Sequence, residues 1–146
     1  MEPSVTLFGP LDRLLAGWMG WVLLALVVLN MLTRSLAHRR HVSQAEAGGG
    51  EAVNRYAPHV AANVLLVLAA FYYLTLHHHA GIVVSVLVVG LFLTDFFEFE
   101  ARKVEARRGV DLERPKGAIA ASILVLLYVG YLSVFFIIKP FWSAVV

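Results

Sequence analysis

The chain has 146 residues, of which 60% are hydrophobic and 15% charged, whereas soluble domains contain roughly 45–50% apolar and about 25% charged residues. This composition leaves no room for a soluble catalytic domain, and the absence of cysteine excludes disulfides, thiolate metal sites and thiol catalysis. The net charge of +2 comes from basic residues that flank apolar stretches, so we expect no nucleic-acid partner.

Four long apolar stretches, separated by polar segments, dominate the sequence. About 20 helical residues cross the ~30 Å hydrocarbon core of a bilayer. The sequence therefore predicts an all-α, polytopic membrane protein, a single domain in which four transmembrane helices form a bundle. The predicted spans are about residues 14–33, 58–77, 81–101 and 117–138 of the 1–146 domain.

The connections between the predicted spans differ in length. About 25 residues join the first two spans, and the glycine run 48–50 within them predicts a flexible hinge. The second and third spans meet in a tight turn around residues 77–81. The third span is expected to continue as a helix to Arg108, with Glu98 paired to Arg102 and with Gly109 as its C-cap.

Basic residues gather in two of these connections. Of the 12 Lys and Arg residues, four follow the first span and six follow the third, while the turn after the second span has none. Basic loops stay in the cytoplasm, so we expect both longer loops inside and both termini outside a plasma membrane. These positions are Arg34, Arg39, Arg40 and Arg55, then Arg102, Lys103, Arg107, Arg108, Arg114 and Lys116.

Polar residues cluster near the predicted cytoplasmic ends of three spans. Asp95 and Glu98 lie one turn apart on one face of the third span, Arg34 ends the first, and His59 with Asn63 begins the second. An ionisable group inside a membrane needs a partner. Three interpretations remain open: a structural ion pair between Arg34 and Asp95, simple solvation at the interface, or a carboxylate–histidine site for a proton or a divalent cation.

The histidines of the predicted outer turn are weak metal candidates. His77 and His79 could chelate an ion if the turn is extended, but the favoured interpretation is that they are simply polar residues at an interface. A haem would need two histidines that face each other from different helices, and the sequence offers no such pair within the membrane. We therefore expect no cofactor.

The fourth span carries a candidate contact face for another protein. Gly130 lies between Tyr128 and Tyr131, and a small residue between aromatic neighbours lets a second helix approach closely. The alternative is that Gly130 packs only against another span of the same chain.

Three stretches carry a resemblance to a known family. Residues 71–77, 94–107 and 112–118 resemble a family of small uncharacterised membrane proteins of halophilic archaea. The resemblance implies an archaeal plasma membrane and a four-helix fold, and it implies no activity.

The function expected from these observations is not catalytic. The sequence is typical of an integral subunit of a larger membrane complex, of respiratory or transport type, with lipid and other proteins or copies of itself as partners. The alternative is a small oligomeric proton or cation transporter or channel that uses Asp95, Glu98 and His59.

Overall fold

Helices account for nearly all of the computed structural model, which describes residues 9–145 apart from the side chains of residues 136 and 137. In chain order they are α1 (Pro10–Leu15), α2 (Met19–Gly48), the short 3-10 helix η1 (Gly49–Ala52), α3 (Ala57–Leu76), α4 (His78–Arg108) and α5 (Lys116–Val145). No strand occurs among the described residues, so the predicted all-α class is confirmed.

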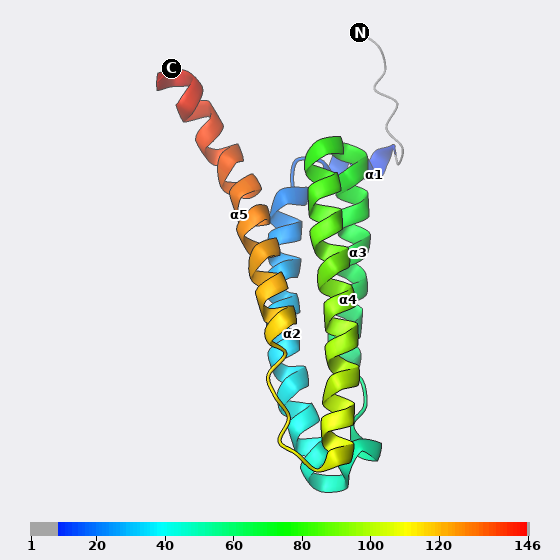
Figure 1. Ribbon diagram of the computed structural model, residues 1–146. Helices are drawn as coiled ribbons and strands as arrows, with labels where there is room; N and C mark the ends of the chain where they lie inside the picture. Colours follow the sequence, from blue (N-terminus) through cyan, green and yellow to red (C-terminus); the bar gives the residue numbers. More distant parts are fainter. Residues whose placement is uncertain (1–8, 146) are drawn as a thin grey trace.

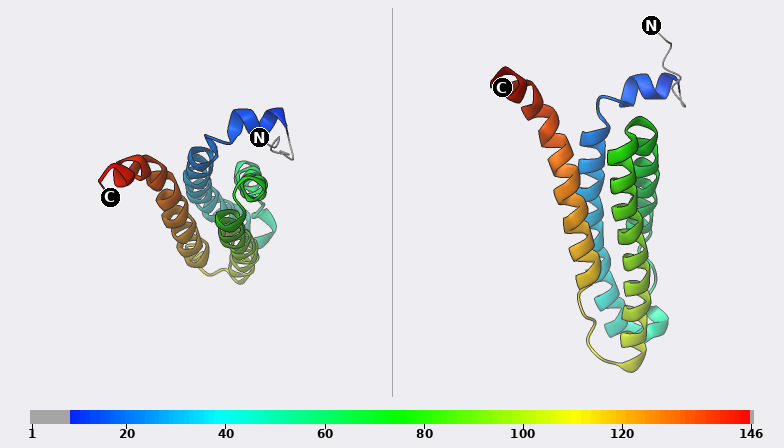
Figure 2. Two further views of the ribbon diagram at one scale, coloured as in Figure 1. Left: turned by 90° about the horizontal axis from the view of Figure 1, so that it is seen from above. Right: turned by 45° about the horizontal axis from the view of Figure 1, so that its top comes forward.

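Four of these helices are long and apolar enough to cross a membrane, as predicted: α2, α3, α4 and the part of α5 up to Phe135. They form a bundle in which α3 packs between α2 and α4, and α5 packs on the other side of the same two helices (Figures 1 and 2). We call the end of the bundle with the α3–α4 turn the turn end, and the end with η1 and the α4–α5 connection the loop end. Helix α1 and the last turns of α5 both lie at the turn end (Figure 1).

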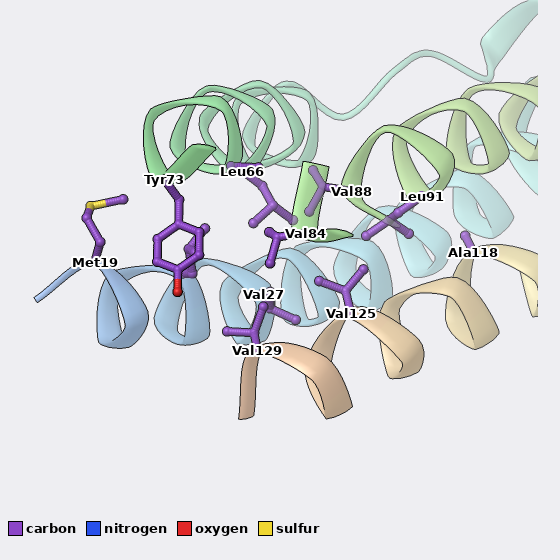
Figure 3. Packing of buried hydrophobic residues seen from close by; sticks show 12 residues of the cluster. Met19, Val27, Leu66, Tyr73, Val84, Val88, Leu91, Ala118, Val125 and Val129 are labelled. Atoms are coloured by element: carbon purple, nitrogen blue, oxygen red, sulfur yellow. The ribbon is translucent and has the colours of Figure 1, made fainter. Parts of the chain in front are cut away.

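An apolar core to which all four long helices contribute holds the bundle together (Figure 3). Val27 of α2, Leu66 of α3, Val88 of α4 and Val125 of α5 are all fully buried. On each helix the buried positions recur every three or four residues, which is the spacing of one helical face. The other faces carry exposed leucine and valine, as expected of surfaces that meet hydrocarbon.

The connection after the first span is more regular than predicted. Helix α2 begins at Met19, later than the predicted start of the first span, and continues to Gly48. The glycine run predicted as a hinge ends α2 and begins η1, in which Gly50 is buried. Residues 35–47 contain neither proline nor glycine, so nothing in the chain stops the helix. The extension also packs on α4, where the His41 and Phe99 rings lie 5.1 Å apart.

The turn between α3 and α4 is as tight as predicted. Only His77, in an extended conformation, separates the two helices, and its carbonyl accepts a 2.7 Å hydrogen bond from Gly81 N. Gly81 lies directly against α3: a Cβ atom there would be 2.3 Å from the Cα atom of Leu74. The turn therefore depends on glycine at this position.

Helix α4 ends where the sequence predicts. It runs to Arg108, and Gly109 follows in the left-handed conformation with φ of 72°. Glycine adopts this conformation without strain, and it is the common C-cap of a helix. The cap turns the chain toward α5.

Helix α5 is buried along only part of its length. Its core-facing positions end at Ser133, whose Oγ lies 3.1 Å from the carbonyl oxygen of Gly20 on α2. Every described side chain from residue 134 to residue 145 is exposed. In this region the helix leans away from the rest of the bundle (Figures 1 and 2).

The sidedness of the bundle stays a prediction, in which the loop end faces the cytoplasm. Because the sequence lacks cysteine, single-cysteine variants report on one position each. Ser43 near the loop end and His79 at the turn end are both exposed. In intact cells we expect a membrane-impermeant maleimide to label His79→Cys, and to label Ser43→Cys only after permeabilisation. Labelling of Ser43→Cys in intact cells would contradict this topology.

Candidate functional site

Polar side chains from α2, α3 and α4 meet in the half of the bundle nearer the loop end. We call this set the buried polar cluster; its members are Asn30, Thr33, Arg34, His59, Asn63 and Asp95. Arg34 follows Met19, the first residue of α2, by about 15 residues, or roughly 22 Å of helix. The cluster therefore lies toward one edge of a ~30 Å hydrocarbon layer.

Asp95 is the centre of the cluster. Its Oδ2 atom accepts hydrogen bonds from Arg34 Nη2 and Asn63 Nδ2, both at 3.1 Å, and it contacts His59 Nε2. The Arg34 and Asp95 side chains are 4% and 11% exposed. Asp95 therefore has a partner on each of the two neighbouring helices, Arg34 on α2 and both His59 and Asn63 on α3. The structure thus brings together four of the predicted site residues.

Two further residues fix the orientation of these groups. Asn30 receives a 2.6 Å hydrogen bond from Arg34 Nη2 and donates one of 2.6 Å to Asn63. Thr33 Oγ1 lies 2.8 Å from His59 Nδ1 and 3.0 Å from the backbone carbonyl oxygen of Asn30. Thr33 is a site residue that was not predicted, although its three-residue spacing from Asn30 places both on one face of the helix.

Glu98 makes a different contact from Asp95, although only one turn separates them. Its Oε1 accepts a 2.6 Å hydrogen bond from Gly117 N at the start of α5. The predicted Glu98–Arg102 pair does not form, because Arg102 pairs instead with Glu105 at 2.7 Å. Glu98 therefore connects α4 to α5, whereas Asp95 connects α4 to α2 and α3. The two carboxylates do not act on a common partner.

A cavity of about 230 Å³ adjoins the cluster at the loop end. Asp95, His59 and Glu98 line it together with the basic residues Arg55 and Arg102. It is large enough for several water molecules. The only carboxylates that face it, within the described part of the chain, are those of Asp95 and Glu98. Asp95 Oδ2 and Glu98 Oε1 accept hydrogen bonds, whereas Glu98 Oε2 is buried without a partner among the described residues.

The histidines of the α3–α4 turn do not come together around a common centre. His77 lies beside Tyr73, with ring centroids 4.9 Å apart, whereas His79 is exposed on the first turn of α4. Within residues 9–145, no group of three or more His, Cys, Asp or Glu side chains is arranged to hold a metal ion.

The predicted partner face of α5 is open at its centre. No atom lies within 4 Å of where a Cβ atom of Gly130 would be. Tyr131 is 60% exposed, whereas Tyr128 is partly buried and packs against the core. The glycine therefore does not serve close packing within this chain.

A family model described as "Domain of unknown function (DUF7313)" matches residues 2–146. The chain belongs to this family. The DUF7313 match includes both the buried polar cluster and the open face of α5, and it agrees with the resemblance to an uncharacterised family. Neither a curated protein nor a solved structure shows significant similarity to this DUF7313 chain.

Proposed function

We propose that this protein is a non-catalytic integral subunit of a larger membrane complex, of respiratory or transport type, in an archaeal plasma membrane with both longer loops in the cytoplasm. The observation that carries the proposal is the open face of α5 around Gly130. A transmembrane helix of another protein is the occupant that this face fits.

The face forms a groove of about 410 Å³ along α5. Gly130 lines it together with the larger residues Leu127, Tyr131, Val134 and Phe135. The residues by which α5 packs into its own bundle, such as Val125 and Val129, are fully buried elsewhere on the helix. Helix α5 therefore has one face that packs into its own bundle and a second, separate face that carries the groove.

A partner helix accounts for this groove better than lipid does. Lipid chains adapt to any apolar surface, so a lipid-facing helix has no need of a small residue beside large ones. Two helices in a membrane, by contrast, gain stability mainly from close backbone approach and from polar contacts between them. Gly130 permits the approach, and the exposed Tyr131 can supply a hydroxyl group.

The buried polar cluster favours a structural role over chemistry. Asp95 is held by groups from two other helices, including the cation of Arg34. A carboxylate fixed in this way stabilises the bundle, and it would have to break these contacts to bind a substrate or an ion. This is why we do not propose an enzyme.

The test compares two glycines that both have open space beside them but lie on different helices. A Cβ atom would meet nothing within 4 Å at either Gly130 of α5 or Gly90 of α4. In mild detergent, we expect Gly130→Leu to abolish co-purification with the native partners while the monomer keeps its helical circular dichroism spectrum. Gly90→Leu is expected to leave the complex intact. Complexes that survive in the Gly130→Leu variant would rule out this face as the docking site.

The contact between His59 and Asp95 at the cavity favours one second candidate, an oligomeric proton or cation transporter or channel that also uses Glu98. Imidazole and carboxylate groups in contact are suited to proton transfer. Proton or cation flux through the purified protein in liposomes, abolished by Asp95→Asn, would replace the subunit proposal with this one.

A further inference from the structure

A second hollow, of about 340 Å³, lies between α2 and the start of α5 at the loop end. We call it the basic hollow, because Arg34, His38, Arg39 and Arg114 line it. No acidic residue is among the described residues that line it, although Asp95 contacts Arg34 from the other side. It differs in this respect from the cavity beside the cluster, where Asp95 and Glu98 offset the basic groups.

Arg34 has hydrogen-bonding capacity that the protein does not use. The residue is 4% exposed, and its Nη2 atom makes the bonds to Asn30 and Asp95. The Nε and Nη1 atoms are buried and have no hydrogen-bond partner within residues 9–145. An unsatisfied buried N–H group is costly, and the cost is larger when the group is charged. These atoms need an acceptor from outside the chain, a water molecule or an anion, and Arg34 lines both the basic hollow and the cavity beside the cluster.

The other two arginines of the hollow are also available to a ligand. Arg39 and Arg114 are exposed, and neither forms an ion pair with any described residue. Guanidinium groups recognise phosphate oxygens by paired hydrogen bonds. The hollow has three guanidinium groups and the imidazole of His38 in its lining. This set of donors is suited to an oxyanion.

We propose that the basic hollow binds a phosphate group, carried either by an anionic lipid or by a soluble phosphate compound. The lining favours the lipid source. Met31 and Ile119 form an apolar part of the hollow, where an acyl chain can lie, while Arg39 and Arg114 lie nearer the loop end. Basic pockets between transmembrane helices at the edge of the hydrocarbon layer bind anionic headgroups by the same chemistry.

The test uses the full-length protein in neutral detergent. Native mass spectrometry measures retained phosphatidylglycerol and phosphatidylcholine, and equilibrium dialysis measures radiolabelled inorganic phosphate. The test variant is Arg39→Gln/Arg114→Gln. The matched control is Arg107→Gln/Arg108→Gln, which removes the same charge from exposed residues at the same end of the bundle but outside the hollow.

We expect the protein to retain phosphatidylglycerol in preference to phosphatidylcholine, with about thirtyfold weaker retention in the test variant and little change in the control. Retention of inorganic phosphate with the same dependence on the variants would assign the site to a soluble phosphate compound. The proposal is overturned if neither ligand is retained, or if both double variants weaken retention equally. It is also overturned if Arg34→Lys, with an unchanged circular dichroism spectrum, retains phosphatidylglycerol as well as the unmodified protein does.

Discussion

Replacement of Asp95 by leucine is expected to lower the free energy of unfolding by about 3–5 kcal/mol, the usual cost of removing one partner from a buried ion pair. The substitution leaves the Arg34 cation without its carboxylate and removes the acceptor of His59 and Asn63. Titration of the purified protein from mild detergent into sodium dodecyl sulfate, followed by circular dichroism, measures the change.

The sign of the change in unfolding free energy distinguishes a stabilising role of Asp95 from simple partitioning of its side chain into lipid. Leucine enters the hydrocarbon layer more favourably than aspartate, so partitioning alone predicts a more stable protein. The matched control is Glu100→Leu, because the Glu100 side chain is 52% exposed and pairs at 3.1 Å with Arg55 on the outside of the bundle. Exposed pairs contribute about 0–1 kcal/mol. An equal loss in the two variants would show that Asp95 is not the centre of a stabilising cluster.

Replacement of Gly81 by alanine is expected to destabilise the bundle by about 3 kcal/mol, at the upper end of the range for overpacking, because the added methyl group collides with the backbone of α3. The new Cβ atom would lie 2.3 Å from the Cα atom and 2.8 Å from the N atom of Leu74. Backbone atoms cannot rotate away as a flexible side chain can, so the α3–α4 turn must open. The same detergent titration detects the loss.

Gly90→Ala is the control for this second substitution. Gly90 lies in the same helix, is exposed, and has open space where its Cβ atom would be. Alanine there removes the helix penalty of glycine, so we expect stability to stay the same or to rise by up to about 1 kcal/mol. Equal losses at both positions would mean that general helix distortion, and not the contact with Leu74, determines the effect.

Hydropathy and helix-end signals were sufficient to predict the four helices. The second span was placed at 58–77 and is found at Ala57–Leu76, because a proline near its start and a polar turn at its end define it. The left-handed Gly109 likewise ends α4 as its position predicts. The extension of α2 was not foreseen, because its charged residues look like a loop when the helix that they pack against is unknown.

The candidate site was less predictable than the fold. Polar residues near the ends of the apolar spans can be recognised in the sequence, and they predict a cluster of Arg34, His59, Asn63 and Asp95. Which partner each side chain takes depends on helix rotation and on distances across the bundle, which a single sequence does not define. Glu98 illustrates the difficulty, since its partner is a backbone amide on α5.

We propose that the contact between Arg34 and Asp95 stabilises the bundle and does not serve as an ion path. A double-mutant cycle tests this claim most directly, with Arg34→Met, Asp95→Leu and the double variant compared in the same unfolding titration. We predict that the double variant is more stable than the sum of the two single losses implies, by about 1–3 kcal/mol, because no unpaired buried charge remains. Strictly additive losses, together with ion flux through the unmodified protein in liposomes, would contradict the claim.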